Sequence, residues 1–289
     1  MKELLNILEW PKHGDAHGKT PVKNLGFLSC ANKVDIKHVP FYGPCIITVL
    51  SGKKTIFDPR GTITCEAGCT VTVPAPASFD LRNEPDHQSK RYKALVIPFA
   101  HKALDDLSKV HGINHDRHDN DVRVLKFEYD ATLAEALKHY LTCGDNGALM
   151  NHRLMEILLI LVSKNASLLS YTLAQDVWSQ RVRAILATDL TRDWDIAEVC
   201  KRLATTESTL RRNLNKENVG FREMLSELRM TTALMQLLQT NHPVYRVAYD
   251  CGYQSVSRFS ANFHKRFGLP PRDFRESLNE LEHGLPVSG

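Results

Sequence analysis

The last hundred residues repeat one pattern twice: a short helix, a tight polar turn, and a second helix with regularly spaced apolar residues. The first copy covers residues 194–216 and the second covers residues 243–267. Between them, residues 221–240 contain neither Gly nor Pro, which predicts one continuous helix. Two helix-turn-helix units separated by a helical spacer are suited to contact two places on one DNA duplex. This part of the chain is therefore predicted to bind double-stranded DNA.

In the first unit, the spacing of apolar and polar residues predicts one buried and one exposed helix face. Leu210 and Leu214 are four residues apart and should point inward, and Thr206 suits the N-cap position. The opposite face carries arginine, which suits the O6 and N7 atoms of guanine. The alternative is a solvated surface helix. The candidate DNA contacts are Thr206, Ser208, Thr209, Arg211, Arg212, Asn215 and Lys216.

The second unit repeats this geometry around an aromatic stripe. Pro243 suits a first helical turn, Gly252 suits the tight turn, and Phe259, Phe263 and Phe267 should pack inward. The outward face is less basic, so we expect more phosphate contacts than base contacts from it. Its candidates are Ser255, Val256, Ser257, Arg258, Ser260, Ala261, Asn262, His264, Lys265 and Arg266.

The basic charge is concentrated in the same region. Residues 179–278 contain sixteen Lys and Arg against eleven Asp and Glu, whereas the whole chain of 289 residues carries a formal charge of only +4. A local basic excess is typical of a surface that contacts phosphates.

The N-terminal part has a different pattern. Between residues 25 and 99, short β-branched runs alternate with turn residues, which predicts a small β-sandwich or barrel. Helices are predicted at residues 131–142 and 147–165, a loop at 111–121 and the linker near 168–175. The fold class is α+β, with a β-rich domain over residues 1–170 and an all-α domain over residues 171–283.

Candidate sites outside the DNA-binding units are fewer. An apolar or small anionic effector inside the β-domain would contact Lys33, His38, Phe41, Tyr42 and Arg91, with Ile47, Phe57 and Phe79 as further lining. The strongly apolar helix at 147–165 suggests dimerisation through Leu154, Ile157, Leu158 and Leu161. His87 and His101 are isolated, so we expect no metal site and no cofactor.

Composition favours a cytoplasmic protein. No run of about 18 apolar residues suggests a membrane span, and no signal peptide is expected. The seven cysteines are odd in number and lack a CxxC pair, which predicts reduced thiols. Cys65 and Cys69 are the best candidates for a redox pair.

The run from Ala248 to Leu278, AYDCGYQSVSRFSANFHKRFGLPPRDFRESL, resembles the C-terminal signature of AraC/XylS-type transcription regulators. The stretches WDIAEVC and FREMLSELRM are most similar to its virulence- and stress-response branch. The resemblance covers residues 179–278 and implies two helix-turn-helix motifs joined by a linker helix, preceded by a cupin-like β-jar with helices. Two residues depart from the pattern: Ala204 stands where the first turn often has Gly, and Asn213 replaces a larger or apolar residue.

The resemblance implies a transcription activator that binds double-stranded DNA and RNA polymerase. A repressor or anti-silencer with the same DNA domain is the main alternative, and a monomeric DNA-bending protein is another. An enzyme with a β-jar active site is a rival of a different class, but the sequence shows no Ser-His-Asp set, metal-ligand spacing or phosphate loop.

Overall fold

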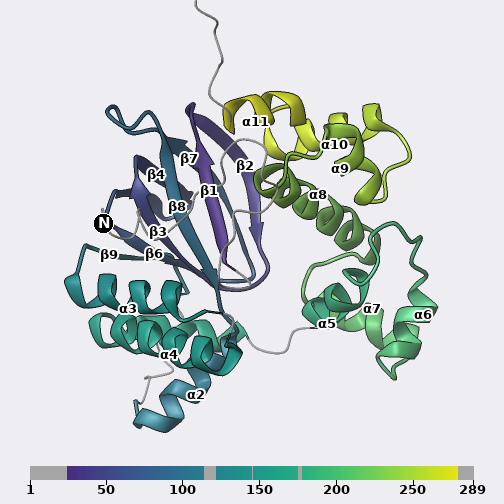
Figure 1. Ribbon diagram of the computed structural model, residues 1–289. Helices are drawn as coiled ribbons and strands as arrows, with labels where there is room; N and C mark the ends of the chain where they lie inside the picture. The colour runs from purple at the N-terminus through teal and green to yellow at the C-terminus, as the bar shows by residue number, and fades with distance from the viewer. Residues whose placement is uncertain (1–24, 114–121, 145, 175–177, 279–289) are drawn as a thin grey trace, which may run out of the picture.

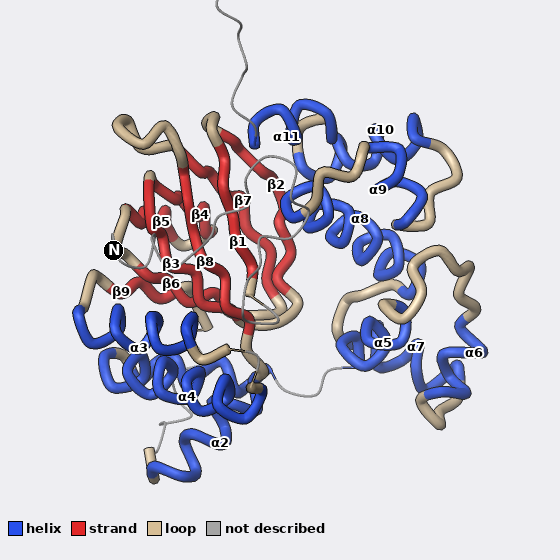
Figure 2. The backbone as a smooth tube through the Cα atoms, in the orientation of Figure 1, coloured by secondary structure: helices blue, strands red, loops and turns tan. Residues whose placement is uncertain are grey.

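A computed structural model describes residues 25–113, 122–144, 146–174 and 178–278. Its N-terminal part contains two antiparallel sheets, shown in red in Figure 2. The first has the order β1-β8-β3-β6-β9 and the second the order β2-β7-β4-β5. The strands are β1 (Gly26–Cys30), β2 (Val34–Phe41), β3 (Cys45–Ser51), β4 (Lys53–Asp58), β5 (Gly61–Glu66), β6 (Thr70–Val73), β7 (Ala77–Glu84), β8 (Tyr92–Pro98) and β9 (Leu125–Phe127).

The five-stranded sheet separates two apolar layers because successive side chains of a strand point to opposite faces. The two sheets together form a β-jar, which is called the jar below. Ile47 of β3 packs inside the jar, between the two sheets, whereas its neighbour Ile46 packs against helices. Those helices are α2 (His101–His111), α3 (Ala131–Thr142), α4 (Gly147–Lys164) and the 3₁₀ helix η1 (Ala166–Ala174). Figure 1 shows α2, α3 and α4 stacked below the sheets.

The C-terminal part is entirely helical within the described residues. It contains α5 (Trp178–Leu186), α6 (Ile196–Arg202), α7 (Glu207–Lys216), α8 (Phe221–Gln239), α9 (Val244–Asp250), α10 (Val256–Phe267) and α11 (Pro271–Leu278). The first unit is therefore α6 and α7, the second is α9 and α10, and α8 is the spacer. None of the helices in the described ranges combines the length and apolar character that crossing a bilayer requires.

The jar packs directly on the second unit. Figure 1 shows α8, α10 and α11 beside β1 and β2, and one continuous apolar cluster contains jar residues such as Ile36 together with Leu234 of α8 and Phe263 of α10. The backbone amides of Ala31 and Asn32 both donate to the Ser277 carbonyl oxygen, at 3.2 and 3.1 Å. A change in the jar can therefore reach α10 and α11 through direct contacts.

Most of the predicted elements are present. The predicted β-branched runs form β1, β3, β4, β5, β6 and β8, and the two predicted helices are α3 and α4. The sequence pattern did not predict strands β2, β7 and β9 or helix α2. The predicted linker is wrong over residues 168–174, because they belong to η1, where Leu168, Leu169 and Tyr171 are buried. The predicted loop at 111–121 lies largely outside the described residues.

The cysteines follow the sequence prediction only in part. Cys65 and Cys69 form a disulfide across the turn between β5 and β6, with their Cα atoms 5.4 Å apart, so the expectation of reduced thiols is wrong for this pair. The other cysteines are free thiols. Burial raises the pKa of Cys45 and of Cys251 to about 12, so these thiols are neutral and pack as small apolar side chains.

Candidate nucleic-acid interface

Helix α7 presents the polar face that the sequence predicts. Leu210 and Leu214 are 0% and 2% exposed. The Thr206 Oγ1 atom accepts a hydrogen bond from the Thr209 amide at 3.2 Å, which confirms Thr206 as the N-cap. Ser208, Arg211, Arg212, Asn215 and Lys216 are exposed on the opposite side.

The two arginines of α7 differ in their partners. Arg211 forms an ion pair with Glu207 one turn earlier, with 2.6 Å between Nη2 and Oε1. Arg212 makes no ion pair or hydrogen bond with any described residue of the chain. Arg212 can therefore reach a base without losing an existing partner, whereas Arg211 must leave Glu207.

Helix α10 exposes a mixed face above its aromatic stripe. Phe259, Phe263 and Phe267 are fully buried, and the Ser255 hydroxyl caps the helix by accepting from the Arg258 amide at 3.3 Å. Ser257, Arg258, Ala261, His264 and Lys265 are exposed, while Val256, Ser260 and Asn262 are half-buried. Val256 packs against the core.

Arg266 differs from the other candidates on α10. Its guanidinium lies 3.6 Å from Glu227 of α8, and Glu227 also pairs with Arg183 of α5 at 3.3 Å. This side chain is directed to the junction between the units, whereas Arg258 and Lys265 are exposed. The phosphate contacts of all three residues stay predictions.

Helix α8 joins the two units through separate groups of apolar residues. Leu228 packs in the core of the first unit, whereas Leu237 packs in the core that the second unit shares with the jar. Each unit is thereby fixed to one half of the same helix. The distance between α7 and α10 is consequently set by a folded element.

A second connection between the units passes through the loop before α6. The Arg229 guanidinium of α8 donates to the carbonyl oxygens of Leu190 and Arg192, at 2.9 and 3.0 Å. The turn of the second unit also approaches this loop closely, because a Cβ added at Gly252 would lie only 2.3 Å from the Leu190 oxygen. Gly252 has a φ of 80°, so glycine is required both by its conformation and by this contact.

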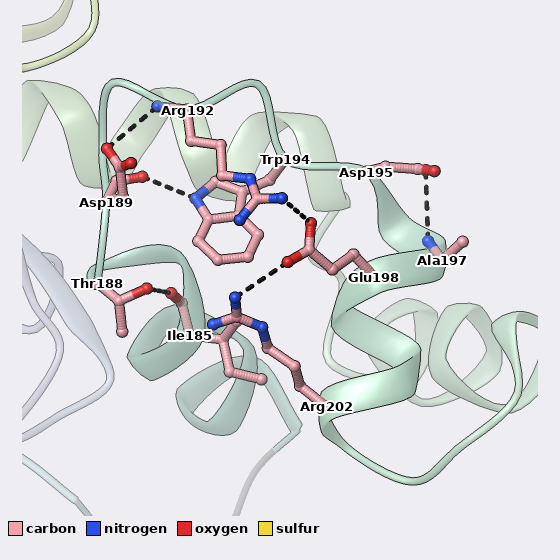
Figure 3. Close-up of polar contacts among 9 residues, drawn as sticks. All are labelled: Ile185, Thr188, Asp189, Arg192, Trp194, Asp195, Ala197, Glu198 and Arg202. Carbon is pink, nitrogen blue, oxygen red and sulfur yellow. Dashed lines mark hydrogen bonds and ion pairs between the residues drawn. The ribbon is translucent and has the colours of Figure 1, made fainter.

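The same loop is stabilised by a cluster around Trp194 (Figure 3). The guanidinium groups of Arg192 and Arg202 lie 4.8 and 4.7 Å from the Trp194 ring, and both pair with Glu198. The indole N–H donates to the Asp189 carbonyl oxygen at 2.7 Å. These contacts stabilise the loop whose backbone oxygens Arg229 contacts.

The structure also places the two departures from the family pattern. Ala204 has a φ of 49°, so the first turn uses a left-handed residue without the freedom of glycine. Asn213 is half-buried on α7 and does not prevent Leu210 and Leu214 from packing.

The predicted effector residues do not form one site. Lys33 and His38 lie on the exposed face of the jar and pair with Glu84 and Asp80. Tyr42 packs against the helical part, where its hydroxyl lies 3.1 Å from the Thr231 hydroxyl and its ring lies 4.3 Å from the Arg183 guanidinium. Arg91 donates to the Leu278 carbonyl oxygen at 3.3 Å.

Of the predicted lining, Phe41, Ile47 and Phe79 pack with the jar core, and Phe41 and Phe79 have ring centroids 6.0 Å apart. Phe57 does not, because it is 37% exposed and lies under the Arg82 guanidinium. The cation that does lie inside the jar, Lys54, was missed.

The predicted dimerisation residues are mostly core residues. Ile157, Leu158 and Leu161 are 0% exposed and pack against α2, α3 and the five-stranded sheet, whereas Leu154 is half-buried. The strongly apolar sequence of α4 therefore reflects burial within its own domain, and a dimer contact by these three side chains is excluded. His101 is also a core residue, with Nδ1 2.6 Å from the Tyr171 carbonyl oxygen. Among the described residues no cluster of His, Cys, Asp or Glu is arranged to hold a metal.

Comparison with known families agrees with both halves of this architecture. A model described as a helix-turn-helix domain matches residues 199–277, and one described as the ExsA N-terminal regulatory domain matches residues 44–171. The chain therefore combines an AraC-type helix-turn-helix domain with an N-terminal domain that matches the ExsA regulatory domain.

Two curated relatives show the extent of the similarity. The urease operon transcriptional activator of Escherichia coli is 35% identical over 97 residues, which are 34% of this chain and 33% of the relative. The DNA-binding dual transcriptional regulator Rns of Escherichia coli is 28% identical over 157 residues, 53% of this chain and 57% of the relative. The matched segments therefore span less than two thirds of these relatives.

Solved structures of ToxT from Vibrio cholerae share the fold over nearly the whole chain. An apo ToxT variant has a TM-score of 0.63 at 17% identity, covering 88% of this chain and 97% of ToxT. Wild-type ToxT bound to an unsaturated fatty acid has a TM-score of 0.61 at 16% identity, covering 88% and 95%. The two-domain fold of ToxT, a β-rich domain followed by a helical domain, is thus shared by this chain.

Proposed function

We propose that this chain is a sequence-specific transcription regulator that places α7 and α10 in two adjacent major grooves of one DNA duplex. The observation that carries the proposal is the double connection between the units, through α8 and through the Arg229–Leu190–Gly252 contact. Two recognition helices held at a fixed distance favour one composite site over two independent ones.

The length of α8 sets the geometry. Its 19 residues make a rod of roughly 28 Å at 1.5 Å per residue. Successive major grooves on one face of DNA lie about 34 Å apart, so the duplex bends toward the protein or α10 inserts only partly. A single subunit should protect an asymmetric site of roughly 15–20 base pairs.

Footprinting on a selected binding site tests this function. We expect two protected segments one helical turn apart on the same face. Inserting five base pairs between them is the control, because it rotates the second groove to the opposite face and should abolish protection of one segment. A footprint confined to one groove, or unchanged protection after the insertion, would contradict the two-groove proposal.

We further propose that the jar controls the DNA-binding half in response to a small effector. The contact of β1 and β2 with α8, α10 and α11 supports this, because a ligand that favours one packing of this interface changes DNA affinity. The fatty acid bound to ToxT supports a small-molecule effector in this fold. We also propose that the protein activates transcription through RNA polymerase in the cytoplasm. Dimerisation would use a surface other than the buried face of α4.

A further inference from the structure

The jar contains a buried ammonium group. Lys54 of β4 is 0% exposed, and its Nζ atom donates to the Asn83 Oδ1 atom at 2.7 Å. The same Nζ lies 5.5 Å from the centre of the Tyr92 ring. Throughout the described part of the chain, no carboxylate contacts this ammonium. Buried charges are ordinarily paired with a counter-charge, so Lys54 lacks a normal partner.

The Tyr92 ring near this ammonium carries a buried hydroxyl without a partner. Tyr92 is 0% exposed, and none of the described residues forms a hydrogen bond with its hydroxyl. An ammonium has three N–H donors, of which Asn83 accepts one. The Lys54 ammonium and the Tyr92 hydroxyl thus both have hydrogen-bond donors without an acceptor inside the apolar jar. Almost every buried polar group in a folded protein normally has a hydrogen-bond partner. An acceptor with negative charge would satisfy both.

The surrounding side chains indicate the size of that acceptor. Cys30, Cys45 and Asn83 are 2%, 4% and 5% exposed, and Ile56 on the same strand face is fully buried. Side chains packed this closely favour a compact guest over an extended one.

Strand register places the group under an interdomain contact. Tyr92 is paired with Cys30 in the first sheet, and Asn83 is paired with Val34 in the second. Cys30 and Val34 are the two ends of the turn whose Ala31 and Asn32 amides donate to Ser277 of α11. The side chains that hold Lys54 therefore belong to the strands that fix this turn.

We propose that Lys54 and Tyr92 bind a compact monovalent anion, such as a halide or a small carboxylate of the size of formate or acetate, inside the jar. The anion pairs with the Lys54 ammonium and accepts from the Tyr92 hydroxyl, which joins β4 and β8 beneath the Cys30–Val34 turn. Binding thereby strengthens the contact of the turn with α11. The regulatory part of this inference rests on the proposed control of the DNA-binding half by the jar, whereas anion binding itself does not.

The test uses the full chain without DNA, because salt affects DNA binding through the phosphates in any case. Urea unfolding is measured at constant ionic strength while sodium gluconate, whose anion is too large, is replaced by chloride, formate or acetate. We expect a saturable rise in stability with at least one compact anion. At ten times the dissociation constant, the unfolding equilibrium constant should fall about elevenfold. Comparing the chloride arm with the carboxylate arms identifies the kind of anion.

Variants locate the effect. Lys54→Met and Tyr92→Phe should lose the anion response, and Lys53→Met, at the adjacent half-buried position, should keep it. Hydrogen exchange at the Ala31 and Asn32 amides should slow with the anion in the wild type and in Lys53→Met only. An equal response to gluconate and to every compact anion, or a response kept by Lys54→Met, would overturn the proposal. Tyr92→Phe gives the same decision if Lys54→Met does not fold.

Discussion

Arg229 and Gly252 converge on one backbone atom, the Leu190 carbonyl oxygen. Arg229 Nε donates to this oxygen at 2.9 Å, and a Cβ at Gly252 would lie 2.3 Å from it. The three residues belong to the spacer helix, to the turn of the second unit and to the loop before the first unit. The spacing of the two recognition helices therefore depends on a contact as well as on the stiffness of α8.

Replacing Gly252 by Ala should destabilise the protein by more than the roughly 1–2 kcal/mol that a left-handed residue costs without a clash. The added methyl group meets the Leu190 oxygen in addition to the unfavourable φ of 80°. Gly112→Ala is the matched control, because Gly112 has a φ of 61° but open space around the added Cβ. Urea unfolding of both variants measures the difference, and equal losses would show that the contact is unimportant.

Replacing Arg229 by Met should leave the chain folded but loosen the spacing between the units. The two hydrogen bonds to the Leu190 and Arg192 oxygens are lost, while the aliphatic part of the side chain is kept. Binding to a two-groove site should weaken, and sites lengthened or shortened by one base pair should be discriminated less. Fluorescence anisotropy on a set of spacing variants measures this. Undiminished discrimination would mean that α8 alone sets the distance.

Ala204→Gly should stabilise the protein by about 1 kcal/mol, because Ala204 has a φ of 49°. Ala261→Gly is the opposite control: it lies in the interior of α10, where glycine costs about 1 kcal/mol relative to alanine. The midpoints of chemical unfolding compare the two. A loss of stability in Ala204→Gly would contradict the assignment of strain to this turn.

Arg212→Ala should weaken specific DNA binding by about 1–3 kcal/mol, and Arg211→Ala should weaken it less. The reason is that Arg211 already pairs with Glu207, and breaking that pair offsets part of what a base contact provides. Glu207→Gln should accordingly make Arg211→Ala more harmful. Anisotropy titrations with target and random DNA measure both. An equal loss on random DNA would show that Arg212 contacts phosphate instead of a base.

Lys54 should make stability depend on pH in the alkaline range. Burial lowers the pKa of Lys54 from 10.5 to about 8, so between these values the unfolded chain binds more protons and the free energy of unfolding rises with pH. Across this pH window the free energy of unfolding rises by roughly 3 kcal/mol, since each pKa unit corresponds to about 1.36 kcal/mol. Below pH 8 the full penalty remains, so Lys54→Met should be the more stable protein at pH 7 in gluconate.

The difference between wild type and Lys54→Met isolates this effect, because the Cys30 and Cys45 thiols, whose pKa values are raised to about 12, contribute with opposite sign to both proteins. Urea unfolding from pH 7 to 10.5 provides the measurement. A difference that does not change with pH would exclude a lysine with a lowered pKa.

The DNA-binding half was largely predictable because its signals are local. The spacing of Phe259, Phe263 and Phe267, the N-cap at Thr206 and the turn at Gly252 each follow from contacts within a few residues, and the structure has all of them. The ion pair of Arg266 with Glu227 could not be predicted, because Glu227 is distant in the sequence.

The jar was less predictable because its contacts are distant in the sequence. β2 and β7 pair through residues that are 36 to 49 positions apart, from Phe41–Ala77 to Val34–Asn83, and both strands carry mixed polar residues, so they lack an apolar signal. The sequence does contain one indication that Lys54 faces the core. Lys54 is two residues before Ile56, and residues two apart on a strand share a face. Hydrophobicity alone gives no reason to place a lysine inside the jar.

The shared core of the jar and the second unit decides which pieces of this protein can be exchanged with those of a relative. Met230, Leu234 and Phe263 pack in the jar cluster, whereas Val199, Leu210 and Leu228 pack in a separate one. A chimera that combines the jar of a relative with the helix-turn-helix units of this chain would replace only one of the two surfaces that pack together. The jar and the second unit would then no longer be complementary. The first helix-turn-helix unit, in contrast, carries its own core. New DNA preferences should therefore be easier to graft, and to evolve, through α6 and α7 than through α9 and α10.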